Sequence, residues 1–543
     1  MSFGSVQQVN LRMWLKNGFN RWRLALLVFI VIYAFFLLLE LGYMSIQWDE
    51  APHLYGGLLL THGRSQEYLA TYGYYPPLYD LLTTGYFQIL GVSAASGRLV
   101  AATFSLFSIW IVFEFANRTY GPKTALISSI LLGTMPGFFW VSRVAMLETM
   151  LMFFFSLSLF LFLSWMRRFD QNKALILCGL ALGVGLLAKY QILVAGIVML
   201  ALILLLYRDK LRVRLSKFLL LPIIALIVVL PWVLIVVQTN GFDRFGELLY
   251  VIQEGGQDRV AYSSRFPAPI FYLIELTWPF SDIAVHPISL PIFILGLLGL
   301  GFWAYRRKPE DKFFLIWFIV VYVFFTLIPN KQWRYITPIF PVLAISAASF
   351  IFFVYGNIGA VWKSGQLSLG NRRVRQIAAA LFIVLVTSAI FYSSYEAYQM
   401  TERDQIYIPI EETVNYATSN MTQNESIVLV CAFNLFNQDM ARFYLPANMS
   451  KDQVWQYPEL PVDSFKPDFN VTELIDLCEQ HNVKWVILYD YGTDAPFFNT
   501  TLTIQNVKTM ISASGRFGKI ADEPWYGFGT HPHRVFIFGF LHN

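Results

Sequence analysis

Residues 24–53 read LALLVFIVIYAFFLLLELGYMSIQWDEAPH, an almost wholly apolar run that ends in two adjacent carboxylates, Asp49 and Glu50. The apolar part, residues 24–46, has the length that an α-helix needs to cross roughly 30 Å of hydrocarbon. It is longer than the core of a signal peptide, and no small-residue cleavage pattern follows it. We therefore predict a retained membrane helix whose outer end carries two acidic side chains.

The rest of the chain repeats this pattern. It has 543 residues, of which 56% are hydrophobic, 17% aromatic and 14% charged. The apolar residues form blocks of about twenty, separated by short basic loops, which predicts a polytopic α-helical membrane protein. The formal net charge is +5, and Lys and Arg lie between the blocks rather than on one face, so we expect no nucleic-acid partner. The eleven predicted spans are residues 24–46, 95–117, 124–140, 144–166, 174–189, 191–207, 218–238, 287–305, 313–329, 335–355 and 376–394.

The distribution of basic residues predicts the orientation. If the N-terminal segment, residues 1–23, is cytoplasmic, the inner segments hold 22 Lys and Arg residues and the outer segments before the tail hold nine. The positive-inside rule therefore places the N-terminus in the cytoplasm and, after eleven crossings, the C-terminus outside. The first outer loop, residues 47–94, carries two weaker apolar stretches that we interpret as interfacial helices. A second long outer loop is residues 239–286.

Residues 396–543 form a polar tail with β-rich runs at 427–433, 484–489 and 534–540 and a helix-like segment at 471–481. This alternation predicts a small extracytoplasmic α/β domain. Five glycosylation sequons favour an N-glycosylated tail and an archaeal-type cell membrane or an ER membrane. They begin at Asn420, Asn424, Asn448, Asn470 and Asn499. Whether Cys431 and Cys478 form a disulfide stays open.

Ionisable side chains gather at the outer ends of the predicted spans. They are Asp49, Glu50, Arg98, Arg143, Glu148, Lys189, Lys331 and Arg334, with Tyr335 beside the last. Each could be an ordinary juxtamembrane charge, but the outer face is otherwise poor in cations, which favours an anionic ligand for the set. A carboxylate can act as a general base, and Lys and Arg can bind phosphate. The set therefore suits transfer of a group from a lipid phosphate to a water-side acceptor.

An ordered series of motifs resembles a known family. The series is Asp49-Glu50, Tyr75-Pro76-Pro77-Leu78-Tyr79, Ser96-Gly97-Arg98-Leu99, Arg143-Val144-Ala145-Met146-Leu147-Glu148, Gly185-Leu186-Leu187-Ala188-Lys189-Tyr190 and Lys331-Gln332-Trp333-Arg334-Tyr335-Ile336-Thr337-Pro338. It is similar to the motifs of the protein O-mannosyltransferase and aminoarabinose-transferase-like membrane glycosyltransferases of the GT-C fold. The likeness covers roughly residues 20–350. Two departures are Tyr75, where relatives often have His or Lys, and Glu148, where Asp is common.

The resemblance implies a catalytic transmembrane domain, residues 24–395, that uses a polyprenyl (dolichyl-type) phosphate-linked sugar. It implies that Asp49 is the catalytic base and that Glu50 supports it. The implied donor-phosphate ligands are Arg98, Lys189, Lys331 and Arg334. Further active-site candidates are Tyr79, Arg143, Glu148 and Tyr335.

We therefore expect a glycosyltransferase that moves a hexosyl or pentosyl group to an acceptor hydroxyl on the extracytoplasmic side, with inversion. The acceptor, a protein, a lipid or a glycan, stays open. So does a divalent cation, for which Asp49, Glu50 and Glu148 are the candidate ligands. The alternative is a polytopic transporter of a lipid or glycolipid that performs no covalent chemistry, although the internal repeats typical of transporters are not evident.

Overall fold

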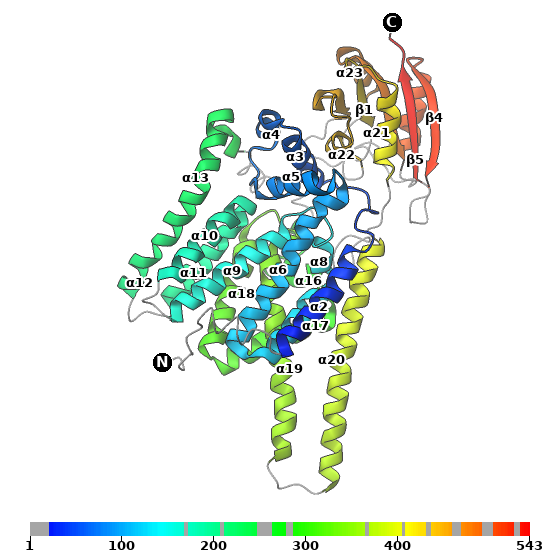
Figure 1. Cartoon of the computed structure of the whole chain (residues 1–543). Helices are drawn as coiled ribbons and strands as arrows, with labels where there is room; N and C mark the ends of the chain where they lie inside the picture. Colours follow the sequence, from blue (N-terminus) through cyan, green and yellow to red (C-terminus); the bar gives the residue numbers. More distant parts are fainter. Residues whose placement is uncertain are drawn as a thin grey trace.

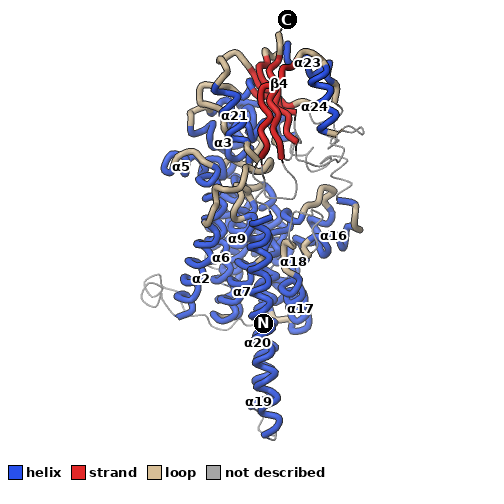
Figure 2. Tube along the Cα trace, turned by 90° about the vertical axis from the view of Figure 1, so that its right-hand side faces the viewer, coloured by secondary structure: helices blue, strands red, loops and turns tan. Residues whose placement is uncertain are grey.

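The computed structural model of the protein describes residues 21–167, 172–206, 211–246, 263–277, 286–363, 369–403, 408–430, 436–458, 469–490, 503–525 and 533–542. These residues form a bundle of long helices with a small sheet-containing domain at one end (Figures 1 and 2). The first twenty residues, much of the predicted outer loop 239–286, Cys431 and Asn499 lie outside the described residues.

Each of the eleven predicted spans falls on one of the helices of the bundle or on two consecutive ones. The bundle and its connections comprise α2 (Arg21–Leu38), α6 (Ala94–Tyr120), α7 (Pro122–Thr134), α8 (Pro136–Val141), α9 (Glu148–Arg167), α10 (Asn172–Ala188), η1 (Tyr190–Ile192), α11 (Leu193–Leu206), α12 (Leu211–Phe218), α13 (Leu220–Asn240), η3 (Phe242–Phe245), α16 (Ala268–Glu275), α17 (Leu290–Arg306), α18 (Pro309–Leu327), η4 (Trp333–Ile339), α19 (Phe340–Lys363) and α20 (Leu369–Arg403).

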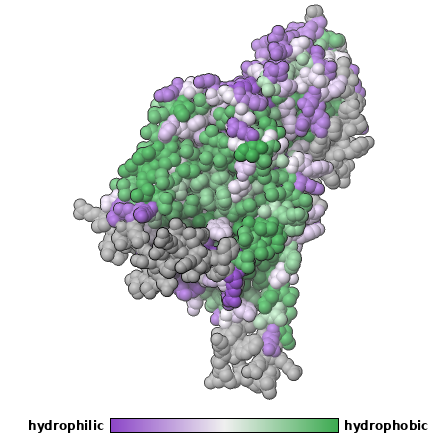
Figure 3. Space-filling view, viewed as in Figure 1, coloured by the Kyte–Doolittle hydropathy of each residue, from purple (hydrophilic) through white to green (hydrophobic). Residues whose placement is uncertain are grey.

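Six helical stretches among the described residues are long and apolar enough to cross a membrane. They are Arg21–Leu38, Ala94–Tyr120, Glu148–Arg167, Leu215–Asn240, Trp333–Asn357 and Gln376–Met400. Apolar side chains cover much of the bundle on the face that Figure 3 shows, as contact with lipid requires. The prediction of a multi-pass membrane protein is confirmed, whereas the number of eleven crossings stays a prediction.

The first helix ends earlier than the sequence predicted. Helix α2 stops at Leu38 rather than near residue 46, and Glu40 adopts a left-handed backbone conformation with φ 53°. The guanidinium of Arg143 donates hydrogen bonds to Phe36 O at 3.0 Å and to Leu37 O at 2.7 Å. A helix end needs such donors for its last carbonyl groups, and here they come from more than a hundred residues away. The apolar run alone could not reveal this stop.

Helices α17 and α19 pack closely because small residues of α17 face α19. A Cβ added at Gly299 would come within 2.2 Å of the Ser346 carbonyl oxygen. The Ser346 hydroxyl donates a hydrogen bond to Gly296 O at 2.9 Å. Small residues at a helix interface in a membrane let the backbones approach and gain van der Waals contact.

We expect Gly299→Ala to destabilise the bundle by about 1–3 kcal/mol, because the added methyl group must force the two helices apart. Gly301→Ala on the same helix is the control, since a Cβ there meets nothing within 4 Å among the described residues. Thermal unfolding in detergent measures both effects. Equal unfolding midpoints for the two variants would contradict the close packing of α17 against α19.

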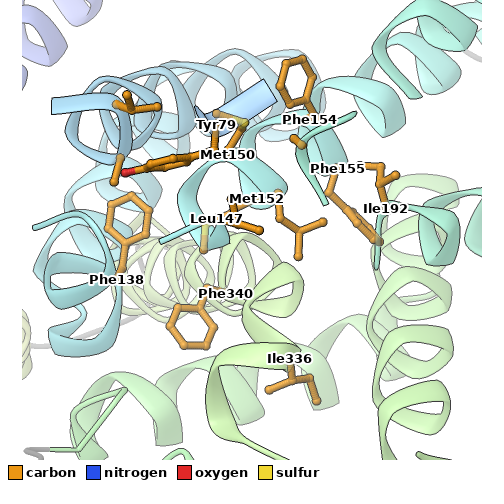
Figure 4. Packing of buried hydrophobic residues seen from close by; sticks show 14 of the residues in the cluster. Tyr79, Phe138, Leu147, Met150, Met152, Phe154, Phe155, Ile192, Ile336 and Phe340 are labelled. Carbon is orange, nitrogen blue, oxygen red and sulfur yellow. The ribbon is translucent and has the colours of Figure 1, made fainter. Parts of the chain in front are cut away.

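Buried apolar side chains fill the bundle directly behind the loops that carry the polar motifs. Figure 4 shows Tyr79, Leu147, Met150, Phe155 and Ile336 among the buried residues that come together there from different elements. Leu147 and Ile336 are neighbours in sequence of Glu148 and Tyr335, so this packing fixes the backbone from which those side chains extend.

The first outer loop folds into three short helices, α3 (Ala51–Thr61), α4 (Ser65–Tyr72) and α5 (Leu78–Leu90). Both apolar stretches predicted to be helical in this loop, 51–60 and 78–90, are helices. Figure 1 shows α3 and α5 between the end of the bundle and the small domain. Whether they lie in the membrane interface stays a prediction.

The tail is an α/β domain, as predicted. Its strands are β1 (Ser426–Val430), β2 (Val454–Gln456), β3 (Val483–Asp490), β4 (Phe517–Trp525) and β5 (His533–Phe540), and its helices are α21 (Ile410–Ser419), α22 (Gln438–Phe443), η5 (Lys451–Gln453), α23 (Val471–Gln480) and α24 (Ile504–Ala513). The sheet order is β2-β1-β3-β5-β4. Strand β1 pairs in parallel with β2 and β3, whereas β5 pairs antiparallel with β3 and β4. Cys478 is buried with a free thiol, and the four described sequon asparagines are exposed.

The tail domain contacts the first outer loop and the residues directly before that loop. Ser45 Oγ donates to Ile408 O at 2.9 Å, and Lys451 Nζ donates to Thr71 Oγ1 at 3.0 Å. The two segments therefore lie at the same end of the bundle (Figure 2). The number of crossings between these segments, and with it the side on which each terminus lies, stays a prediction.

Candidate active site

Asp49 and Arg334 form an ion pair at the end of the bundle that carries the small domain. The Asp49 Oδ2 atom lies 2.6 Å from Arg334 Nη1, with 26% and 14% of the two side chains exposed. Arg334 Nε also donates to Gln332 Oε1 at 2.6 Å. The carboxylate is thus partly open to solvent and is held by a guanidinium that comes from a segment almost three hundred residues further along the chain.

Glu148 and Lys189 form a second ion pair next to the first. The Lys189 Nζ atom lies 2.7 Å from Glu148 Oε1, and 3% of the Glu148 side chain is exposed. The Tyr335 ring connects the two pairs, because Lys189 Nζ lies 5.9 Å and Arg334 Cζ 5.8 Å from its centroid. Arg334 also interacts electrostatically with Glu148. The structure thus brings together five of the predicted site residues from four separate segments.

Breaks in the helices place these groups at the end of the bundle. Glu148 is the first residue of α9, and Lys189 has an extended backbone between α10 and the 3-10 turn η1. Arg334 and Tyr335 lie in η4, whose Pro338 lacks the N–H of a regular helix. In a membrane protein, irregular backbone near the ends of the spanning helices is tolerated where it is buried in protein or lines a cavity.

Of the predicted phosphate ligands, Lys331 has the fewest partners for its positive charge within the described residues. Its side chain is buried, with the residue 7% exposed. Its Nζ atom makes one long hydrogen bond, 3.4 Å to Pro329 O, within the part of the chain that the structure describes. Burial lowers the pKa of Lys331 below the ordinary lysine value. A buried cation with so few partners is suited to an anionic ligand.

Glu50 and Arg98 form a separate, fully buried ion pair. Arg98 Nη2 lies 2.5 Å from Glu50 Oε1, and neither side chain is exposed. Arg98 Nε donates to Glu50 Oε2 at 3.1 Å. The remaining Arg98 donors reach the carbonyl oxygens of Leu41, Met44 and Ser45 at 2.8 to 2.9 Å.

Both members of this pair have protein partners on every side. The five N–H groups of a guanidinium are the whole donor capacity of an Arg, and the Arg98 contacts account for all of them. Glu50 also accepts hydrogen bonds from the backbone N–H groups of Gln47 at 2.8 Å and Ala145 at 2.7 Å. This geometry holds the loop between α2 and α3 in place rather than presenting a cation or a carboxylate to a ligand.

Two further candidates, Arg143 and Tyr79, also bind backbone groups. Arg143 caps the end of α2, as described above. The Tyr79 hydroxyl donates to Gly97 O at 3.1 Å, and the side chain is fully buried. Burial, together with the nearby Glu50 charge, raises the pKa of Tyr79 well above its ordinary value, so this hydroxyl stays protonated.

The sequence analysis missed a buried polar cluster in the first outer loop. Asp80 Oδ1 lies 2.9 Å from His53 Nδ1, and the Tyr68 hydroxyl donates to Asp80 Oδ2 at 2.8 Å. The signal available in the sequence was a single carboxylate within the apolar stretch 78–90. A lone acid there needs a partner, but the sequence does not tell which residue provides it.

The donor set does not form a metal centre in the described part of the chain. No three His, Cys, Asp or Glu side chains lie close enough there to bind one ion. Of the three candidate ligands, Glu50 is occupied by Arg98 and by backbone N–H groups. Glu148 is occupied by Lys189. We therefore assign no step of the reaction to a metal ion.

Known proteins share both sequence and fold with this chain. The family described as dolichyl-phosphate-mannose-protein mannosyltransferase matches residues 75–235. An uncharacterized protein of Aquifex aeolicus (strain VF5) is 27% identical over 334 residues, which cover 60% of each chain. The undecaprenyl phosphate-alpha-4-amino-4-deoxy-L-arabinose arabinosyl transferase 2 of Proteus mirabilis is 26% identical over 322 residues, which cover 55% of this chain and 53% of that protein. The crystal structure of ArnT from Cupriavidus metallidurans in the apo state has a TM-score of 0.63 at 15% identity and covers 94% of this chain and 97% of its own.

These matches define the class of protein: the chain has the GT-C fold of membrane glycosyltransferases. In sequence it is similar to aminoarabinose transferases and, over residues 75–235, to the protein mannosyltransferase family, which are the resemblances that the motifs predicted. The chain spans three fifths or less of the length of these two curated relatives, so its activity has to be inferred from its own residues.

Proposed function

We propose that the protein transfers a sugar from a polyprenyl (dolichyl-type) phosphate-linked donor to an acceptor hydroxyl on the extracytoplasmic side of the membrane. The observation that carries this proposal is the paired arrangement at the end of the bundle. A partly exposed carboxylate, Asp49, pairs with Arg334, and the Tyr335 ring lies between this pair and the pair of Lys189 with Glu148. A third cation, the buried Lys331, lies three residues before Arg334 in the sequence. Such an arrangement offers a base to a hydroxyl group and positive charge to a leaving phosphate.

In the reaction we propose, Asp49 takes the proton of the acceptor hydroxyl as its oxygen attacks the anomeric carbon. The bond between this carbon and the donor phosphate oxygen breaks, and its electron pair leaves with the polyprenyl phosphate. A single displacement of this kind inverts the anomeric centre. The cations stabilise the charge that develops on the phosphate, which is often the largest electrostatic contribution to such a reaction.

The comparisons support the donor class. The Proteus mirabilis relative is described as an undecaprenyl phosphate arabinosyl transferase, and one structure of the Cupriavidus metallidurans protein is bound to undecaprenyl phosphate. The matched family is described by a dolichyl-phosphate-mannose donor and a protein acceptor. A polyprenyl phosphate is common to these descriptions, whereas the sugar and the acceptor differ. We therefore propose the lipid phosphate and leave the choice between hexosyl and pentosyl transfer to experiment.

The buried pair has a different part in this proposal. We assign Glu50 and Arg98 to positioning the Asp49 loop, because their polar atoms are already bound within the protein. Donor phosphate binding then falls to the remaining three cations. Arg143 and Tyr79 likewise hold the backbone near the site, and the Tyr335 ring lies between the Asp49–Arg334 pair and the Glu148–Lys189 pair.

The test is transfer by the purified chain in liposomes that contain polyprenyl-phosphate donors with a radiolabelled sugar. Peptide, lipid A-type lipid and glycan acceptors are offered in separate reactions, with both a hexose and a pentose donor. We expect label to become covalently attached to one acceptor class and unlabelled polyprenyl phosphate to be released. Label that crosses the bilayer still attached to its lipid would show a transporter and overturn the proposal.

The lowered pKa of Lys331 gives a second expectation. As the pH rises through that pKa, the ammonium group loses its proton and with it the attraction for phosphate. We expect binding of undecaprenyl phosphate to weaken as the pH rises, at a lower pH than for an ordinary lysine with its pKa of about 10.4, and to weaken less in Lys331→Arg, because a guanidinium keeps its charge over this range. Quenching of tryptophan fluorescence measures binding. Identical alkaline profiles for the two proteins would remove Lys331 from the phosphate site.

A further inference from the structure

One carboxylate joins the three helices of the first outer loop. Asp80 on α5 accepts a hydrogen bond from Tyr68 on α4 and pairs with His53 on α3. The three side chains are almost fully enclosed, since Asp80 is 0%, Tyr68 2% and His53 5% exposed. Burying a carboxylate is costly unless it is hydrogen-bonded or paired, so this cluster determines how the three helices sit together.

The local sequence provides room for the cluster. A Cβ added at Gly56, three residues after His53, would come within 3.0 Å of Asp80 Oδ2 and 3.1 Å of the Tyr68 ring. Only a residue without a side chain lets α3 approach the carboxylate so closely. The Tyr79 ring covers the imidazole from α5, with centroids 5.3 Å apart.

Contacts of His53 connect the cluster to the part of the candidate site that contains Asp49. His53 lies in the first turn of α3, and its backbone N–H donates to Glu50 O at 3.1 Å, directly after Asp49. Its ring packs edge-on against Tyr75, with centroids 5.5 Å apart. The Tyr75 hydroxyl in turn interacts electrostatically with the Asp49 carboxylate. His53 therefore contacts the turn that carries Asp49 through its backbone, and contacts Tyr75 through its imidazole ring.

We propose that His53 and Asp80, assisted by Tyr68, are positioning residues for the general base Asp49. The hydrogen bond from His53 Nδ1–H to Asp80 fixes the first turn of α3 and the Tyr75 ring, and thereby the direction in which the Asp49 carboxylate meets the acceptor hydroxyl. This inference rests on the proposed function. It gives the cluster no part in donor binding, because the three proposed phosphate-binding cations lie on other elements.

Two substitutions of His53 distinguish the effect of its hydrogen bond to Asp80 from the effect of its ring packing against Tyr75. In His53→Asn the side-chain amide nitrogen, like Nδ1, is attached to Cγ and can still donate to Asp80, whereas His53→Phe keeps the ring against Tyr75 and loses the donor. We expect kcat of the Phe variant to fall about 10- to 100-fold, as for other lost positioning contacts, and kcat of the Asn variant to stay within about 5-fold of the native value. Asp80→Asn should resemble the Phe variant. We expect KM for the donor to change less than about 2-fold in all of them.

Three results would overturn the inference. They are a Phe variant with native kcat, a loss that appears in donor KM, and a loss that merely follows the folded fraction measured by thermal unfolding. A readout without turnover keeps the test separate from the proposed function. In a chain whose own cysteines are serine, Asp49→Cys reacts with a methanethiosulfonate reagent, and we expect His53→Phe, but not His53→Asn, to change that rate several-fold. An unchanged rate would overturn the positioning role even if sugar transfer is confirmed.

Discussion

We expect Asp49→Asn to lower the rate of sugar transfer by about 10²- to 10⁴-fold, the range that a general base usually contributes. The amide has the shape of the carboxylate and its oxygen can still accept a hydrogen bond from Arg334, so the site should keep its form. It cannot take a proton from the acceptor hydroxyl. Because the donor phosphate is bound by cations, binding of undecaprenyl phosphate should stay near its native value.

Asp476→Asn on α23 is the matched control for this prediction, because it removes one exposed carboxylate from the tail domain. Its transfer rate should equal that of the native chain. Initial rates at saturating donor, together with fluorescence binding of the lipid phosphate, measure both variants. Native turnover by Asp49→Asn would remove the proposed base. Loss of lipid-phosphate binding without loss of fold would instead assign Asp49 to the donor site.

The sequence predicted the bundle well because a membrane leaves few choices. Backbone groups in hydrocarbon must bond within their own helix, so blocks of about twenty apolar residues predict helices directly. What the blocks could not show is where distant residues interrupt them. Arg143, more than a hundred residues away, binds the last carbonyl groups of the first helix, which ends at Leu38. This effect leaves no trace in local hydropathy. The break at Pro136, which divides the predicted span 124–140 into α7 and α8, is local, and hydropathy alone does not show it.

The sequence predicted which residues gather at the candidate site, but it did not predict which acid pairs with which base. Span counting put the charged groups at one end of the bundle, and the structure brings Asp49, Glu148, Lys189, Arg334 and Tyr335 together there. Which acid faces which base depends on how the helices are rotated and spaced, and neither quantity can be read from one sequence. The catalytic role of Glu50 and the donor role of Arg98 stay predictions from the resemblance. Their geometry favours a positioning role for both.

That geometry predicts a large effect on stability. We expect Arg98→Met to destabilise the protein by about 3–5 kcal/mol, because removing one member of a buried ion pair leaves the other, Glu50, as an uncompensated charge. Three backbone carbonyl groups between α2 and α3 would also lose their donor. Arg98→Lys should recover only part of the loss, because one ammonium group cannot reproduce the planar five-donor geometry.

Arg118→Met is the control on the same helix, since Arg118 lies in the last turn of α6 and donates to Ser164 Oγ at an exposed position. Its cost should be about 1 kcal/mol or less. A double-mutant cycle with Glu50→Gln adds a second criterion. The double variant should be less destabilised than the sum of the two single changes, because each single change leaves the other partner buried and unmatched.

Unfolding midpoints in detergent and binding of undecaprenyl phosphate then decide between the two roles of Arg98. If Arg98 positions the loop, Arg98→Met lowers the midpoint, and the folded fraction that remains still binds the lipid phosphate through Lys189, Lys331 and Arg334. If Arg98 binds the donor, the midpoint stays near that of Arg118→Met and lipid-phosphate binding falls instead. The first outcome is expected because every N–H of Arg98 already has a protein acceptor, so a phosphate could be bound only by breaking contacts that hold the Asp49 loop.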